Sequence, residues 1–325
     1  MCGIAGLIYY DPEQYKNFGS TLLSLIQPLE SRGPDSCGVA LYHDRPTPSQ
    51  IRLLLGSLQN DHESDDAPWP QVRHWMEQSL CITDWQAIAQ VQQVTLDLTH
   101  QSFDLSQFKQ ALHHQFPALH VVSAGQAMEI YKGIGSVEGL ADLYGLRNFS
   151  GTHGIGHTRM ATESVVDTHH SHPFTSSYDL SLVHNGQVSN YYKLRFQLER
   201  MGAVFETQND SEAIAHYIYY QLLQGKSLEA SLHQLLADID GTYTFLVATR
   251  DKVALVRDKY AAKPAVIYEQ SGMVAIASEY RALLNLPQFD STAKLREPGA
   301  GEVNIWSVIP TPQAAHASPL SLLAP

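Results

Sequence analysis

The first 45 residues show two hydrophobic periods in succession. Small and β-favouring residues from Met1 to Tyr10, stopped by the turn pair Asp11-Pro12, predict a strand. Apolar residues then recur at helical spacing from Phe18 to Leu29 and stop before a turn-rich stretch at 31–36, which predicts a helix followed by a loop. Residues 37–42 return to the strand pattern. The chain is therefore expected to begin as strand, helix, loop and strand.

The pattern changes between about residue 44 and residue 120. This stretch is acidic, interrupted by prolines and dotted with histidines, and helical patches are predicted around Trp69–Ile88 and Leu105–Phe116. It carries no motif with recognisable chemistry. We interpret 44–120 as an insertion or a small subdomain.

Turn and strand signals return in the middle of the chain, at 131–135 and 151–160. A short apolar strand at 180–184 follows, and the turn pair Asn185-Gly186 predicts its end. Further on, Asn209 and Glu212 have the spacing of a capping box, which predicts a helix that runs to about residue 222.

Four short β-rich runs follow residue 241, namely Thr242–Ala248, Lys252–Val256, Ala265–Tyr268 and Met273–Ala277. Their tight turns favour antiparallel pairing over a βαβ array. The whole pattern predicts a mixed α/β protein with sheet at both ends of the chain. The stretch 310–325, rich in Pro, Ala and Ser, predicts a flexible tail.

Composition narrows the class of protein. The 325 residues include 21 Lys plus Arg and 33 Asp plus Glu, a formal net charge of −12, with 44% hydrophobic and 17% charged residues. These values are typical of a globular chain of one large or two modest domains. An acidic balance without basic clusters argues against binding to nucleic acid or to an anionic membrane. No apolar run approaches the ~20 residues of a membrane span. No charged-then-apolar pattern precedes Met1-Cys2, so we do not expect secretion through a signal peptide.

The three cysteines at positions 2, 37 and 81 are too few and too widely spaced for a disulfide framework, so we expect a reducing, cytoplasmic location. Cys37 and Cys81 are predicted to be buried small residues. Cys2 differs because removal of the initiator methionine would give it a free α-amine beside its thiol, a base and a nucleophile in one residue. The alternative is a small apolar residue in a strand, which its position alone favours.

Other residues supply what an amide-hydrolysing cysteine needs. Gly3 leaves room around the thiol. Arg159, predicted at a strand end, could bind a carboxylate in bidentate fashion. Asn185 and Gly186 offer a side-chain amide and an unhindered N–H, the usual pair of an oxyanion hole. Asp210, in the first turn of a helix, could accept from an ammonium group.

Five segments occur in order along the chain: Met1-Cys2-Gly3-Ile4, Arg32-Gly33-Pro34-Asp35-Ser36, Gly156-His157-Thr158-Arg159, His184-Asn185-Gly186 and Asn209-Asp210-Ser211-Glu212. Together they resemble the class II glutamine amidotransferase domain, an N-terminal-nucleophile hydrolase, from residue 2 to about residue 290. The resemblance implies an α+β fold, the four-layer αββα sandwich of these hydrolases. It also implies one amidotransferase domain over 2–309, interrupted by the insertion at 44–120.

The resemblance implies a role for each matched residue. Cys2 would be the nucleophile, with its α-amine as base and acid, and would form a γ-glutamyl thioester from L-glutamine and release ammonia. Asn185 and Gly186 would stabilise the oxyanion. Arg159, assisted by Thr162, would bind the α-carboxylate of glutamine, and Asp210 would bind its α-ammonium. Arg32 would support the nucleophile, and His172 would lie in a loop that closes over the substrate.

Residues 151–162, 241–245 and 277–283, together with the length of the chain, look most like the stand-alone amidotransferase subunit of glutamate-synthase-like complexes, including N-methylglutamate synthase. This resemblance implies an FMN-containing synthase partner on a separate chain and no cofactor on this one. Two other functions stay open: an N-terminal-cysteine amidase acting on another amide, and a non-catalytic glutamine-sensing subunit. Arg159 with Asp210 favours an amino-acid head group.

Three further patterns favour plainer interpretations. His169-His170-Ser171-His172 invites a metal site, but three histidines in four residues cannot easily converge on one ion, so an exposed or substrate-loop run is favoured. The glycine-rich stretch 133–139 lacks the register of a dinucleotide site and predicts a turn. The tyrosine pairs 191–192 and 219–220, on predicted helices, are interpreted as packing residues.

Overall fold

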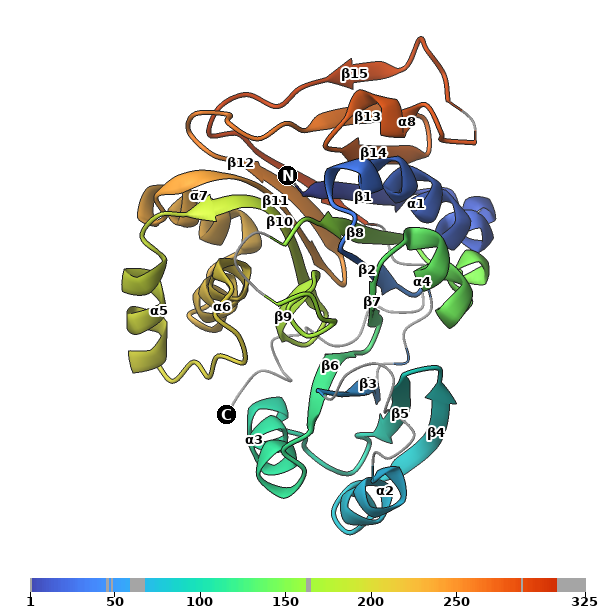
Figure 1. Cartoon of the computed structure of the whole chain (residues 1–325), viewed down its shortest axis with the longest axis vertical. Helices are drawn as coiled ribbons and strands as arrows, with labels where there is room; N and C mark the ends of the chain where they lie inside the picture. The colour runs from blue at the N-terminus through green and yellow to red at the C-terminus, as the bar shows by residue number, and fades with distance from the viewer. Residues whose placement is uncertain are drawn as a thin grey trace.

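The structure is a computed structural model that describes residues 2–44, 47, 49–58, 68–161, 165–287 and 289–308. Within those residues the strands form three sheets, and every strand pair whose register is defined is antiparallel (Figure 1). The predicted tail at 310–325 lies outside the described residues.

The first sheet brings the two ends of the chain together, because β1 pairs with β14 on one side and with β8 on the other. Every residue of β1 is buried, since both faces of this sheet are covered. In spatial order its strands are β15 (Lys294–Arg296), β13 (Val266–Gln270), β14 (Met273–Ala277), β1 (Gly3–Tyr9), β8 (His153–Arg159), β2 (Ser36–Tyr42) and β7 (Met128–Ile134).

The second sheet contains the strands that follow the middle of the chain. In spatial order these are β16 (Val303–Ser307), β12 (Lys252–Arg257), β11 (Gly241–Thr249), β10 (Leu180–Val188) and β9 (Phe174–Ser177). The four β-rich runs predicted after residue 241 are β11, β12, β13 and β14, and their antiparallel pairing is confirmed.

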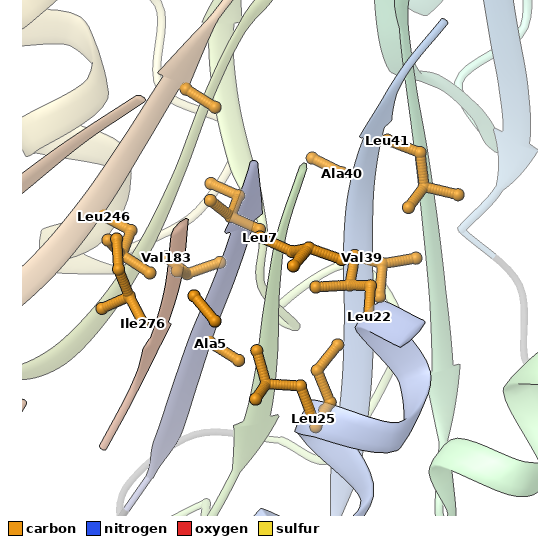
Figure 2. Close-up of a cluster of buried hydrophobic side chains, with 14 of the residues drawn as sticks. Ala5, Leu7, Leu22, Leu25, Val39, Ala40, Leu41, Val183, Leu246 and Ile276 are labelled. Carbon is orange, nitrogen blue, oxygen red and sulfur yellow. The ribbon is translucent and has the colours of Figure 1, made fainter. Parts of the chain in front are cut away.

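The two sheets pack face to face, with a helical layer outside each. Ile276 of the first sheet meets Leu246 and Val183 of the second, whereas Leu22 and Leu25 cover the opposite face of the first sheet (Figure 2). The first outer layer holds α1 (Phe18–Ile26), α4 (Val137–Tyr144) and α8 (Tyr280–Leu283); the second holds α5 (Tyr191–Arg200), α6 (Asp210–Leu223) and α7 (Leu228–Asp238). Short 3-10 helices are η1 (Pro12–Asn17), η2 (Gln27–Arg32) and η4 (Leu146–Asn148). The predicted four-layer αββα sandwich is confirmed.

A third sheet with its own hydrophobic core lies below the sandwich in Figure 1. Its strands, in order, are β4 (Ile82–Ile88), β5 (Val91–Asp97), β3 (Gln50–Ser57) and β6 (Leu119–Gly125), with α2 (Trp69–Glu77) and α3 (Leu105–Gln115) packed against them. The helix predicted at 105–116 is confirmed. That the stretch 44–120 is an insertion into an amidotransferase domain stays a prediction.

The helical prediction for 69–88 is wrong in its second half. The helix ends at Glu77, and residues 82–88 form β4, which pairs with β5 through a tight turn at Ala89, where φ is +49°. Pairing with β5 satisfies the backbone hydrogen bonds of β4 along one edge, and the helical spacing of apolar residues does not report this stabilisation. One burial prediction is also wrong: Cys81 is exposed, while Cys37 is buried as predicted. Of the tyrosines interpreted as packing residues, Tyr192 is exposed, whereas Tyr191, Tyr219 and Tyr220 pack against a hydrophobic core.

Candidate active site

Cys2 lies immediately before β1, where contacts from distant parts of the chain hold its main chain. Arg32 Nε donates to the Cys2 carbonyl oxygen at 3.0 Å, and Glu279 holds the Arg32 guanidinium at 2.7 Å. Two residues along, the Ile4 N–H donates to Ser278 Oγ at 2.8 Å and the Ile4 carbonyl accepts from the Ser278 N–H at 2.9 Å. The start of the chain is therefore fixed by the loop that follows β14 and by the turn that contains Arg32.

The Cys2 thiol is partly exposed and donates to the Met160 carbonyl oxygen, 4.0 Å from the sulfur. Burial raises the pKa of the thiol, and the Met160 contact and the positive charges of Arg159 and Arg32 only partly oppose this. The group is therefore a thiol rather than a thiolate at neutral pH. A nucleophile in that state needs a base close by during attack.

The turn at 32–36 connects the surroundings of Cys2 to those of Arg159. The Asp35 N–H donates to the Arg159 carbonyl at 3.1 Å, and the Asp35 carboxylate accepts from the Ala161 N–H at 2.8 Å. A Cβ at Gly33 would lie 2.5 Å from the Arg159 carbonyl carbon, so a larger residue would push the turn away from β8. One short motif thus positions the backbone on both sides of the thiol.

Arg159 ends β8, as predicted, and is 4% exposed. Its guanidinium donates to the Val165 carbonyl at 3.2 Å. Burial lowers the pKa of this group, while the charges of Cys2, Asp167 and Asp35 raise it; an arginine remains protonated in proteins all the same. A buried guanidinium within electrostatic range of the thiol is suited to a carboxylate. Thr162, predicted to assist Arg159, lies outside the described residues.

Asn185 and Gly186 do not end a strand as predicted, because β10 continues through them to Val188. All nine residues of β10 are matched by residues of β11, so the partner strand overrides the local turn signal. Gly186 has φ +145°, and a Cβ there would lie 2.1 Å from the Thr242 carbonyl oxygen. The position therefore requires glycine.

The Asn185 side chain carries a buried donor without a partner in the described part of the chain. Asn185 is 2% exposed, and its Nδ2 has no hydrogen-bond partner among the described residues. A buried amide N–H₂ without an acceptor is costly, unless the site exists to receive one from outside.

The Gly186 N–H faces the edge of β10 that lies away from β11. Tyr243, opposite Gly186, directs its N–H and its carbonyl to Asp258 instead of to β10. Alternate N–H groups of a strand point to the same edge, and two residues on, the Val188 N–H donates to Asp210 at 2.9 Å. Gly186 N–H and Asp210 therefore share one edge of the sheet.

Asp210 begins α6, as predicted, and its carboxylate is held on two sides. One oxygen accepts from the Val188 N–H, and the other lies 3.4 Å from His184 Nδ1. Burial raises the pKa of this carboxyl, but His184 and the hydrogen bonds from Val188 and Ser211 outweigh it, and the net shift is downward. Asp210 is thus an anion at neutral pH beside the oxyanion-hole candidates.

The capping prediction for this helix is half right. Asn209 caps α6, since its side chain accepts from the Ser211 N–H at 2.9 Å. Glu212 does not return to the Asn209 N–H; its buried carboxylate accepts from the N–H groups of Glu206 and Thr207 at 2.7 and 2.8 Å. The loop before the helix folds back over Glu212 and offers it two donors, which replaces the capping-box bond.

The histidine run at 169–172 divides into separate environments. His172 is 5% exposed, not solvent-facing, and stacks on His157 with ring centroids 3.9 Å apart. His169 contacts the Glu206 carbonyl at 3.2 Å, and His170 binds Asp167 at 2.8 Å. Among the described residues no group of three His, Cys, Asp or Glu side chains is arranged to hold a metal ion.

The structure brings these candidates to one place through direct contacts. Arg32 touches Cys2, and the turn after Arg32 touches Arg159. His157, two residues before Arg159, donates from Nε2 to the carbonyl of His184, the residue before Asn185, at 2.9 Å. Three contact residues are missing from the sequence predictions as site residues: Glu279, Ser211 and His157. Ser211 and His157 lie inside motifs that were singled out, but nothing in the motifs indicates their partners.

Replacing Arg32 by methionine is expected to lower kcat of the reaction in which the Cys2 thiol attacks its substrate about 10-fold, because a displaced reacting group loses its attack geometry. The matched control is Arg32→Lys, which can keep the ion pair with Glu279 but lacks the Nε–H that holds the Cys2 carbonyl. Steady-state kinetics should show both variants impaired. Full activity in Arg32→Lys would show that the charge, not the bond to Cys2, matters.

Comparison with known proteins tests the resemblance. A family model described as the glutamine amidotransferase domain matches residues 142–323, more than half of the chain. The chain belongs to the glutamine amidotransferase domain family. Its relatives include a glutamine amidotransferase-like protein, GlxB, from Rhizobium meliloti, 37% identical over 94% of this chain and 98% of that protein. A putative glutamine amidotransferase from Methanothermobacter thermautotrophicus is 35% identical over 95% of this chain and all of the relative.

A solved structure supports the fold of this amidotransferase. The glutamine phosphoribosylpyrophosphate amidotransferase from B. subtilis matches with a TM-score of 0.59 and 19% identity, over 94% of this chain and 47% of that one, so this chain spans about half of that protein. The amidotransferase is an enzyme whose activity is hydrolysis of the glutamine amide. None of the helices in the described part of the chain combines the length and hydropathy needed to cross a bilayer.

Proposed function

We propose that this amidotransferase is a cytoplasmic glutaminase subunit that works through a thioester on Cys2. The α-amine of Cys2 takes the thiol proton as sulfur attacks the side-chain amide carbon of glutamine. The proton then passes to the departing nitrogen, which leaves as ammonia, and a γ-glutamyl thioester remains. Water, deprotonated by the same amine, cleaves the thioester to glutamate and returns the thiol. The sum is glutamine plus water to glutamate plus ammonia.

The buried, unpartnered Nδ2 of Asn185 is the observation that carries this proposal. A tetrahedral intermediate bears a negative oxygen that needs donors fixed in advance. Asn185 Nδ2 and the Gly186 N–H, next to each other on β10, supply two such donors. The raised pKa of the thiol supports the need for the α-amine as base, since the protein charges around it do not by themselves ionise it.

The head group of glutamine is bound, in this proposal, by Arg159 through the α-carboxylate and by Asp210 through the α-ammonium. Arg159 and Asp210 carry opposite charges. Arg159 is buried and Asp210 is partly buried, so the pair discriminates against amides that lack an amino-acid head group. Thr162 would assist Arg159, and His172 would contribute to the loop that closes over the substrate.

Asp210→Asn is expected to raise the KM for glutamine about 10- to 100-fold and to change kcat little, because a charge-assisted contact to the ammonium is lost in ground and transition state alike. The matched probe is glutaramate, which is glutamine without its α-amine. If Asp210 binds the ammonium, the KM of the variant should be about the same for glutaramate as for glutamine. The KM of the wild type should be higher for glutaramate than for glutamine, by about the factor by which the substitution raises the KM for glutamine. If these two factors differ, the binding of the α-ammonium by Asp210 is contradicted.

The mechanism requires a free α-amine on Cys2. Intact-mass measurement of active enzyme is expected to show loss of Met1. Fully active enzyme that retains Met1 would overturn the mechanism, because the Cys2 nitrogen would then be an amide without basicity.

Two measurements separate this function from its alternatives. A panel of amide substrates should give the highest kcat/KM with glutamine; equal hydrolysis of a non-glutamyl amide would favour a different amidase. A glutamine-like diazoketone should form a covalent adduct on Cys2, detected by mass spectrometry. Binding without an adduct would indicate a glutamine-sensing subunit.

The ammonia acceptor is proposed to be an FMN-containing synthase on a separate chain, within a complex of glutamate-synthase-like type. Two relatives matched over nearly their whole length support a stand-alone amidotransferase, while the glutamine–fructose-6-phosphate aminotransferase of Vibrio vulnificus is matched over 27% of its own length. Purification of the tagged protein from its native cells should recover a flavin-containing chain. Recovery of a flavin-free acceptor enzyme instead would contradict this part of the proposal.

A further inference from the structure

Three buried histidines lie behind the candidate oxyanion hole. His157 on β8, His172 before β9 and His184 on β10 are 0%, 5% and 3% exposed. Two of them adjoin residues with a proposed role in binding or catalysis, since His157 precedes Arg159 by two residues and His184 immediately precedes Asn185. None of the proposed chemical steps uses His157 or His184.

His157 takes the place of a missing strand at the edge of β10. The neighbouring strand β9 pairs with β10 only as far as Leu182, opposite Phe174, where β9 begins. Beyond that point the His184 carbonyl accepts instead from His157 Nε2, at 2.9 Å. This carbonyl belongs to the peptide unit that joins His184 to Asn185, so the contact fixes the peptide plane that contains the Asn185 Cα, the atom from which the Asn185 side chain projects.

The ring of His157 is itself held in place. It stacks on His172 with an angle of 22° between the rings. His172 Nε2 lies 2.8 Å from Ser211 Oγ, and the same oxygen lies 3.0 Å from His184 Nδ1. Burial lowers the pKa of His157 to about 3, so the ring is neutral at physiological pH and its single N–H is the one that meets the carbonyl.

We infer that His157 is a positioning residue for the oxyanion hole: its N–H to the His184 carbonyl sets the Asn185 side-chain amide at the distance that the developing oxyanion requires. This rests on the proposed role of Asn185. A residue that acts in this way affects the transition state and leaves ground-state binding of glutamine almost unchanged.

The test compares His157→Phe with His157→Gln. The side chain of His157→Phe keeps an aromatic ring against His172 but has no N–H donor. The side chain of His157→Gln keeps an N–H near the position of the histidine Nε2. His157→Phe is expected to lower kcat about 10- to 100-fold with KM changed less than about 3-fold, and His157→Gln to recover most of the loss. Affinity for glutamine, measured by calorimetry in a Cys2→Ala background, should be the same with and without His157→Phe.

A double variant ties the effect to Asn185. If His157 acts through Asn185, adding His157→Phe to Asn185→Ala should cause little further loss of kcat. Additive losses, or equal losses in His157→Phe and His157→Gln, would show that His157 is structural only and would overturn the inference. An inactive wild type, or an Asn185→Ala variant with normal kcat, would instead refute the proposed function. If His157→Phe does not fold, His157→Met removes the donor with a more adaptable side chain and enters the same comparison.

Discussion

Replacing Cys2 by alanine is expected to abolish glutamine hydrolysis, with kcat reduced about 10⁴-fold or more, because removal of a covalent nucleophile leaves only the contribution of binding and oxyanion stabilisation. The fold should persist. Cys2 precedes the first strand, and its contact with Arg32 uses the carbonyl oxygen rather than the sulfur. Ammonia release, measured with a coupled assay, and the melting temperature give the two readouts.

Cys81 provides the matched control for this prediction. It is exposed, and it belongs to the third sheet region rather than to the sandwich, so Cys81→Ala should retain wild-type kcat. The Cys2→Ala variant should still bind glutamine, since the proposed head-group contacts come from Arg159 and Asp210. Residual turnover above about 1% of wild type in Cys2→Ala would remove the thioester from the mechanism.

The sequence predicts most of the sandwich because its strands are short, apolar and separated by strong turn signals. It misjudges places where pairing with another strand decides the conformation. Asn185-Gly186 has the composition of a turn, yet β11 pairs along the full length of β10 and keeps both residues extended. The helix predicted at 69–88 ends early because residues 82–88 pair with β5 as the strand β4. Local pattern carries no information about such partners.

The same limit applies to the site. Motifs identify residues with the right chemistry, among them Cys2 and Asp210. They do not reveal that Glu279, 247 positions away in sequence, anchors Arg32, or that Ser211 lies between two histidine rings. These contacts depend on how β14, β10 and α6 are packed, and that packing is a property of the whole sandwich.

Asn185→Ala is expected to lower kcat about 10²- to 10³-fold, the usual cost of removing one oxyanion donor, with KM for glutamine changed little. The structural reason is the state of the free enzyme. Asn185 Nδ2 is buried without a partner among the described residues, so the donor is already stripped of water and needs no reorganisation when negative charge develops. Removing this donor should therefore weaken the binding of glutamine little and the stabilisation of the transition state strongly.

Asn304 offers a matched control in the same sheet. It is also a buried asparagine, 9% exposed, and its Nδ2 likewise has no partner among the described residues. It lies on β16, however, which β11 and β12 separate from β10, and its side-chain oxygen accepts from Arg296. Asn304→Ala should therefore affect the melting temperature more than kcat, and Asn185→Ala the reverse. Asn185→Asp keeps the size of the side chain but replaces the N–H₂ donor by a carboxylate, which would repel an oxyanion, so it should be at least as damaging as Asn185→Ala. An active Asn185→Asp enzyme would show that this side chain does not face the oxyanion.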